Sequence, residues 1–254
     1  MVVSRSGEEI PESSAQANFL SFLYRGILGR ILLRLLRAGW LSRLVGFYMD
    51  SRFSRKRRQD TFPFSKVADD FCSPADSRLT VVPLTDGTAF HVKHAPYTVS
   101  ELIGDEKEAT RFEGGHAFVF RLSVEDYHRY AYPDGGRELS RRSIKGTFHT
   151  VNPIALEKLP VFHRNCREVS LLETEHFGTV AYVEVGAMMV GRIVNHGKKT
   201  FSRGEEKGYF AFGGSTVVIL TEKGGVLPCE DLLANSKKGI ETYVRSGETV
   251  GRKA

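Results

Sequence analysis

The distribution of hydrophobic and polar residues divides the chain into two unlike parts. Between Phe19 and Arg58, aliphatic and aromatic residues alternate with arginines, and the stretch contains a glycine, Gly39, near its middle. An apolar face opposite a basic face is typical of an amphipathic helix. The pattern therefore predicts one or two basic amphipathic helices over residues 19–60, preceded by a polar tail at residues 1–18.

From about residue 61 onward, short apolar stretches alternate with Gly, Pro, Asn and Asp, as is typical of strands and turns. We expect an α+β fold, in which residues 61–254 form one β-rich domain of mainly antiparallel strands with short helices, next to the N-terminal amphipathic helices. The clearest predicted strands are Leu79–Leu84, Ala117–Leu122, Val180–Val190 and Thr216–Leu220, and the predicted short helices are Val99–Ile103 and Asn152–Leu159.

The net charge of the chain and its distribution limit the classes of binding partner. A net charge of +6 suits DNA, RNA or anionic lipid equally well. The basic cluster at residues 52–58 directly follows the apolar, arginine-rich stretch, and this combination favours a membrane surface over nucleic acid. A pair of core-packing helices with a solvated basic face is the alternative. No run of 18 apolar residues and no secretory signal is found, so we expect no membrane-spanning helix.

The spacing of the cysteines does not indicate disulfide bonds or a zinc site. Cys72, Cys166 and Cys229 are widely spaced and form no CxxC pair, so we expect three ordinary thiols in a reducing compartment. The histidines show no spacing that indicates a metal site, and we expect none.

The segment with the most chemical information surrounds Ser215. Gly213, Gly214 and Ser215 stand between an aromatic run and a β-branched run. Taken alone, this tripeptide predicts only a turn or bulge that opens a strand.

The wider sequence is more specific. Residues 208–220 resemble the processing site of phosphatidylserine decarboxylases of the shorter, prokaryotic type, and four other stretches resemble the same family in the same order along the chain. One of these carries Ser77 where the family's Ser-Pro-x-Asp-Gly segment has glycine. The resembling stretches are FCSPADSRL (71–79), DYHRYAYPDGG (126–136), FHTVNPIAL (148–156), VEVGAMMVGRI (183–193) and GYFAFGGSTVVIL (208–220).

The resemblance implies an enzyme that makes its own cofactor. In this family a serine hydroxyl attacks the preceding glycine carbonyl, and the amide becomes an ester. β-Elimination and hydrolysis then leave a pyruvoyl group and ammonia. Here the bond would be Gly214–Ser215, with Ser215 as the pyruvoyl precursor, residues 1–214 as the β chain and residues 215–254 as the α chain. Glycine before the serine leaves the carbonyl accessible and tolerates strained backbone.

The same resemblance assigns the residues that activate Ser215, with one departure. Asp76 corresponds to the aspartate of the family's Asp-His-Ser relay, but Ala131 stands where the family has the relay histidine. Alanine accepts no proton, and loss of a general base costs about 10²–10⁴ in rate. His128 and His149 are the candidate substitutes. We therefore expect slow or absent self-cleavage. A trapped precursor and a chain that uses another base both fit this departure.

The implied reaction converts phosphatidylserine to phosphatidylethanolamine and CO₂. The pyruvoyl ketone would form a Schiff base with the serine amine of the lipid and accept the electrons released by decarboxylation. His128 is the expected proton donor. The family further suggests a homodimer, peripherally bound to the cytoplasmic face of the cell membrane. Two alternatives remain: an inactive membrane-binding protein with the decarboxylase fold, and a pyruvoyl decarboxylase of a soluble amino acid.

Overall fold

The computed structural model describes residues 1–11, 63–84, 89–92, 95–123, 126–147, 164–186, 192–211 and 215–254. The helices predicted within residues 19–60 and at 152–159 lie outside these ranges. Within them, no helix has the length and apolar character needed to cross a bilayer.

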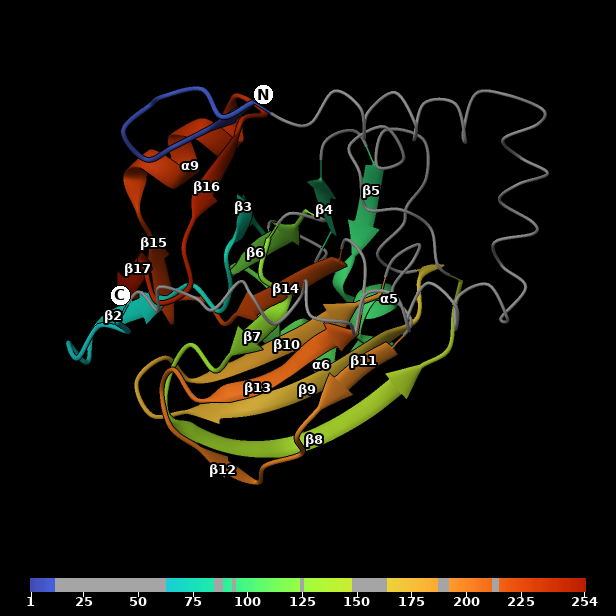
Figure 1. Cartoon of the computed structure of the whole chain (residues 1–254). Helices are drawn as coiled ribbons and strands as arrows, with labels where there is room; N and C mark the ends of the chain where they lie inside the picture. The colour runs from blue at the N-terminus through green and yellow to red at the C-terminus, as the bar shows by residue number, and fades with distance from the viewer. Residues whose placement is uncertain are drawn as a thin grey trace.

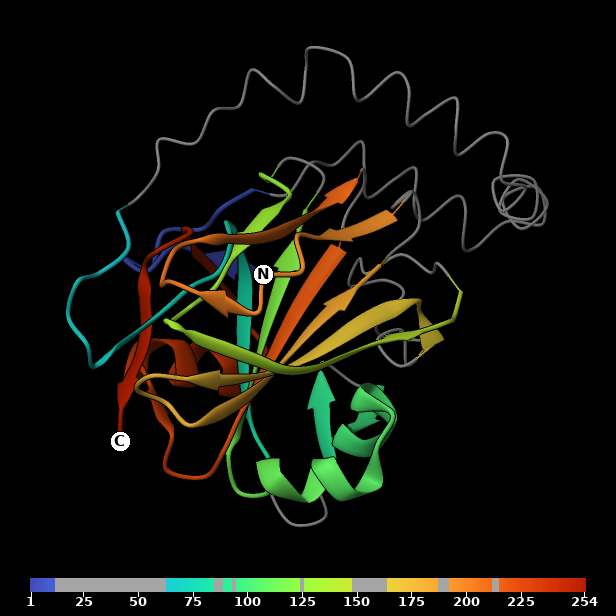
Figure 2. The same ribbon diagram turned by 90° about the horizontal axis from the view of Figure 1, so that it is seen from below.

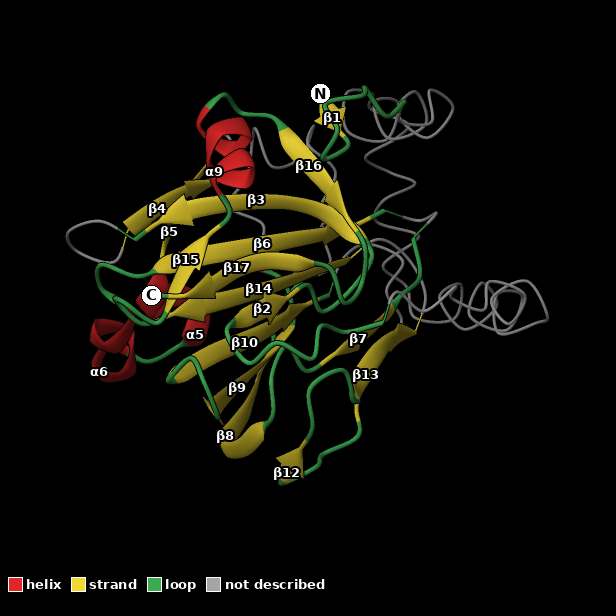
Figure 3. Cartoon of the chain, turned by 90° about the vertical axis from the view of Figure 1, so that its left-hand side faces the viewer, coloured by secondary structure: helices red, strands yellow, loops and turns green. Residues whose placement is uncertain are grey.

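A nine-stranded sheet forms the centre of the fold (Figure 3). All neighbouring strands in it are antiparallel except β1 and β16, which are parallel. The prediction of a β-rich, mainly antiparallel domain is therefore confirmed. In spatial order the strands are β1 (Val2–Val3), β16 (Glu241–Val244), β3 (Ser77–Pro83), β6 (His116–Leu122), β14 (Ser215–Thr221), β10 (Thr179–Val185), β9 (Arg167–Thr174), β8 (Gly136–Ile144) and β12 (Thr200–Phe201).

A second, three-stranded sheet packs on one face of the large sheet (Figure 1). It consists of β11 (Arg192–Asn195), β13 (Glu206–Ala211) and β7 (Arg129–Ala131). The ring of Tyr130 lies between the two layers, with its centroid 4.9 Å from Phe210 in its own sheet and 6.1 Å from Tyr182 of β10. This aromatic contact fixes the position of β7 and β13 above the centre of the large sheet.

The remaining elements pack around the large sheet. One further sheet pairs β15 (Val226–Pro228), β17 (Thr249–Lys253) and β2 (Asp70–Cys72), and a two-stranded sheet joins β4 (Ala89–Val92) and β5 (Ala95–Thr98). Figure 2 shows α5 (Val99–Ile103) and α6 (Glu106–Ala109) together at one end of the molecule, and the 3₁₀ helix η2 (Thr110–Phe112) follows them. The helix α9 (Glu230–Lys237) lies over β3, where the Ser236 hydroxyl accepts a 2.9 Å hydrogen bond from the Val81 amide.

Local sequence accounts for several of these elements. Helix α5 has the predicted bounds because the Thr98 side chain caps the Glu101 amide and Gly104 ends the helix at φ +70°. Strand β10 is buried at every position, which explains its continuous apolar run. It ends at Val185, and the part of the predicted strand beyond residue 186 lies outside the described residues.

The first residues of the chain are part of the fold. Val2 and Val3 pair with Glu241 and Thr242 of β16. The Arg5 guanidinium then binds both carboxylate oxygens of Asp231, at 2.9 and 3.0 Å. The beginning of the polar tail predicted over residues 1–18 is thus an edge strand of the large sheet.

Candidate active site

The predicted cleavage site lies at the end of a central strand. Ser215 is the first residue of β14 and pairs with Leu122, the last residue of β6. Gly214 lies outside the described residues. Because β14 has neighbours on both sides, β6 and β10, the backbone that follows the predicted scissile bond is held in place by two ladders of hydrogen bonds.

Asp76 lies at the same end of the sheet. It directly precedes β3, the other neighbour of β6, and Arg78 pairs with Arg121 one residue before Leu122. Strands in a sheet are about 4.8 Å apart, so Asp76 and Ser215 are about two strand spacings from each other. The Asp76 carboxylate accepts a 2.8 Å hydrogen bond from the Ser246 amide, which fixes it at the turn between β16 and β17.

Position 131 is hydrogen-bonded to the Asp76 segment and to β10, a neighbour of β14. The Ala131 amide donates to the Pro74 carbonyl at 2.9 Å, two residues before Asp76. Its carbonyl accepts a 3.2 Å hydrogen bond from the Tyr182 hydroxyl, and Tyr182 pairs with Ile219 of β14. The position at which the resembling family carries a histidine is therefore bonded to the Asp76 segment and to the strand next to β14.

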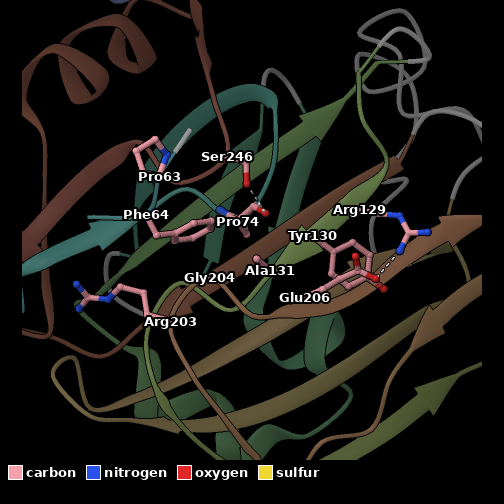
Figure 4. A pocket seen from close by; sticks show the side chains of 10 residues that line it. All are labelled: Pro63, Phe64, Pro74, Arg129, Tyr130, Ala131, Arg203, Gly204, Glu206 and Ser246. Carbon is pink, nitrogen blue, oxygen red and sulfur yellow. Dashed lines mark hydrogen bonds and ion pairs between the residues drawn. The ribbon is translucent and has the colours of Figure 1, made fainter. Parts of the chain in front are cut away.

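A cavity of about 390 Å³ opens at this position (Figure 4). Ala131 and Ser246 both belong to its wall, so the cavity lies beside the residue that holds Asp76. Its volume is within the range of small-ligand sites. The lining residues are Pro63, Phe64, Pro74, Arg129, Tyr130, Ala131, Arg203, Gly204, Glu206 and Ser246.

His128 lies in the connection between β6 and β7. Its carbonyl accepts a 2.9 Å hydrogen bond from the Phe210 amide, one residue before the end of β13. The side chain is half-buried and is not part of the cavity wall described above. The other candidate base, His149, lies outside the described residues.

A buried ion pair holds this connection. Arg78 Nη1 contacts Asp126 Oδ2 at 2.5 Å, and the two side chains are 4% and 6% exposed. The same oxygen accepts from the Ser123 amide at 2.6 Å. Burial raises the pKa of Asp126 to about 6, while the charge of Arg78 acts in the opposite direction. Asp126 therefore anchors the chain that carries His128, a role that the sequence analysis missed.

Other residues at or near the cavity and the Asp76 turn were not predicted from the sequence. Ser246, Tyr182 and Phe64 come from segments that none of the recognised motifs places next to Ala131. The sequence contains a partial signal for Glu184, which is the one acid within the apolar run of β10. An acid is rarely buried without a partner, so this position indicates a buried polar contact.

One group of side chains has metal-ligand spacing. Asp134, Glu175 and His176 are the described residues whose ligand atoms come within 4.8 Å of one another. The Asp134 carboxylate already accepts from Arg203 Nη2 at 2.8 Å and lies 3.0 Å from His176 Nδ1. A cation at this place would compete with the Arg203 guanidinium, so the group is best described as an ion-pair network around the buried Asp134.

Comparison with known proteins identifies one family to which the chain is similar. Residues 49–252 match the family model for phosphatidylserine decarboxylase. The chain is 39% identical to phosphatidylserine decarboxylase proenzyme 2 of Clostridium acetobutylicum, over 91% of each protein. It is 34% identical to the phosphatidylserine decarboxylase proenzyme of Ruminiclostridium cellulolyticum, over 94% of this chain and 93% of the relative. A Clostridium botulinum proenzyme is 40% identical over 79% of this chain and 69% of the relative.

The family match covers the segments that carry Asp76, His128, Ala131 and Ser215, and the two longer alignments extend over nearly the whole of both proteins. A match of this length and identity confirms the resemblance that the sequence motifs indicated. The chain belongs to the phosphatidylserine decarboxylase family of carboxy-lyases.

Proposed function

We propose that this chain is a proenzyme that cuts itself at Gly214–Ser215 and then decarboxylates phosphatidylserine with a pyruvoyl group derived from Ser215. The observation that carries the proposal is the linkage of three segments. The start of β14 and the Asp76 turn lie at the same end of the large sheet, and position 131, beside a cavity, is hydrogen-bonded to Pro74 of the Asp76 segment.

The first step needs only groups of the chain. The Ser215 oxygen forms a bond to the Gly214 carbonyl carbon while the peptide C–N bond breaks, so the hydroxyl proton passes to the released amine. A base must carry that proton. Asp76 is fixed by the Ser246 amide and is suited to orient such a base, but the alanine at position 131 supplies none. We therefore infer that self-cleavage is slow.

The described residues fit a cofactor formed at this place. After cleavage Ser215 would be the first residue of the α chain, at the end of a strand that both neighbours hold. The pyruvoyl group, when present, supplies a carbonyl that accepts the electrons released with CO₂. Within the protein, the cavity at Ala131 gives room for a headgroup. His128, which lies outside the wall of that cavity, is assigned as the proton donor on the family motif alone.

The membrane location is also part of the proposal. The basic amphipathic stretch lies outside the described residues, but the chain that leaves it continues into Pro63 and Phe64, which line the cavity. The acyl chains of the lipid stay in the bilayer, because each buried CH₂ contributes about 0.8 kcal/mol to their retention. The lipid would therefore present its headgroup to the cavity from the side of the basic amphipathic stretch. We place the enzyme as a peripheral protein, expected as a homodimer, on the cytoplasmic face of the cell membrane.

A vesicle assay tests the substrate. The chain carrying Ala131→His, as the form competent for maturation, is incubated with phosphatidylserine vesicles and, separately, with free serine and aspartate. Release of CO₂ and formation of phosphatidylethanolamine from the vesicles alone supports the proposal. Release from a free amino acid favours the soluble-substrate alternative. Continued absence of cleavage in this variant favours an inactive membrane-binding protein, the candidate that Ala131 itself suggests.

The role of Asp76 has its own test. In the Ala131→His chain, Asp76→Asn keeps an oxygen for the Ser246 amide but removes the negative charge. We expect cleavage to slow by about 10²-fold or more, because the relay base loses its orienting partner. Intact mass spectrometry over time measures the rate, and Asp69→Asn, an exposed acid of the same segment, is the control. Equal rates for the two variants would remove Asp76 from the relay.

A further inference from the structure

A second buried ion pair lies between the two sheets. The Lys207 ammonium contacts the Glu184 carboxylate, and the two side chains are 1% and 0% exposed. Lys207 Nζ also donates to Asn195 Oδ1 at 3.0 Å and lies 4.9 Å from the centre of the Tyr182 ring. Asn195 in turn donates to Glu168 at 2.8 Å. None of these groups has a part in the cleavage or decarboxylation steps above.

The Lys207–Glu184 ion pair links the strands on the two sides of the predicted scissile bond. Lys207 belongs to β13, which ends at Ala211, and Glu184 of β10 pairs directly with Val217 of β14. The contact therefore joins the strand that leads to Gly214–Ser215 to the neighbour of the strand that follows it. Only residues 212–214 connect these strands, which belong to two different sheets.

The chemistry of the pair argues against a purely stabilising role. A buried ion pair contributes little net stability compared with well-packed apolar residues of similar volume, because both charges lose their hydration. Among the described residues, Glu184 Oε2 has no hydrogen-bond partner, so the carboxylate is incompletely compensated. Burial accordingly raises the pKa of Glu184, against the opposing charge of Lys207.

Such a pair fixes the position of β13 relative to β10 in the large sheet. Its contact is directional, whereas apolar side chains in the same place would allow β13 to shift along the face of the large sheet. Glu206, the residue before Lys207, pairs with Ala131 in β7. A shift of β13 would therefore move both position 131 and the segment that enters the scissile bond.

We propose that Lys207 and Glu184 are positioning residues for self-cleavage: by pinning β13 to β10 they fix the two strand ends, Ala211 and Ser215, that flank the predicted scissile bond. The inference rests on the proposed cleavage at this bond. A displacement of about 1 Å from the reactive geometry costs about 10²-fold in rate. The pair neither gains nor loses a proton in the step, and acts only through the placement of the backbone.

The test replaces the pair without emptying its site. The double variant Lys207→Met, Glu184→Leu is made in the Ala131→His chain, and cleavage is followed by intact mass. Thermal unfolding of the same double variant is measured in a Ser215→Ala chain, so that cleavage does not interfere. We expect a melting temperature equal to or above that of the parent and a cleavage rate about 10²-fold lower. Lys207→Arg, which keeps the charge, should retain most of the rate.

A matched control uses an ion pair that also crosses two strands but is exposed. This pair consists of Arg137 in β8 and Glu173 in β9. The double variant Arg137→Met, Glu173→Leu should leave the cleavage rate unchanged. The proposal is overturned if the buried double variant cleaves as fast as its parent, or if rate and melting temperature fall together, which would show a merely structural pair. If the Ala131→His parent itself stays intact, the proposed function fails first, and the positioning role fails with it.

Discussion

Replacing Ala131 by histidine is expected to accelerate cleavage at Gly214–Ser215 by about 10²–10⁴-fold, the usual contribution of a general base. The backbone of residue 131 is already bonded to the Asp76 segment and to Tyr182, and the cavity at its side chain gives an imidazole room. Intact mass over time measures the effect. The unmodified chain should remain mainly a single species of 28.4 kDa, and the variant should yield residues 1–214 and 215–254.

Two controls make this result specific. Ser215→Ala in the same background should abolish cleavage, because it removes the attacking hydroxyl. Ala131→Phe fills the cavity with a ring that accepts no proton and should not accelerate the reaction. If the unmodified chain is already cleaved completely on purification, another base serves the site. His128 and His149 are then the residues to replace.

Removing the Glu241 carboxylate is expected to lower the free energy of unfolding by about 3–5 kcal/mol. Glu241 receives two hydrogen bonds from Arg121, at 2.8 and 2.7 Å, and the side chains are 4% and 5% exposed. Glu241→Ala would leave the Arg121 charge in the interior without its carboxylate. Urea unfolding of the Ser215→Ala chain, followed by circular dichroism, measures the loss.

The exposed partner of Arg137 provides the comparison for this effect. Glu173→Ala should cost about 0–1 kcal/mol, as is usual for ion pairs in water. Replacing both buried partners, as Arg121→Met with Glu241→Leu, should recover most of the stability, since no charge is then left unpaired. A loss near 1 kcal/mol for Glu241→Ala would mean that water reaches Arg121.

Elements with a strong local signal could be predicted from the sequence. The helix predicted at Val99–Ile103 has the same bounds in the structure, where a Thr cap and a terminating glycine enclose it. The strands at 79–84, 117–122 and 216–220 were found within two residues of β3, β6 and β14, because their apolar runs end in turn residues. Strand β1 has only two residues, Val2 and Val3, and two residues carry no periodicity.

The order of the strands could not be predicted, because it depends on contacts between distant residues. Nothing local indicates that β14 lies between β6 and β10, or that β16 lies between β1 and β3. For the site, family motifs indicated Asp76, His128, Ala131 and Ser215. In the structure the Ala131 amide is bonded to Pro74, close to Asp76 in the chain, and Ser215 begins β14, which β6 separates from β3. The Ser246 amide and the walls at Pro63 and Phe64 became visible only with the tertiary fold.

The place of β14 has a consequence for the enzyme after cleavage. The fragment 215–254 contributes β14 between β6 and β10, and β16 between β1 and β3. All four of these flanking strands come from the other fragment. A broken peptide bond would thus divide the covalent chain while leaving one hydrophobic core shared by both pieces. Separation would require unfolding of the domain, so the pieces should run apart in detergent and elute as one particle from a native sizing column.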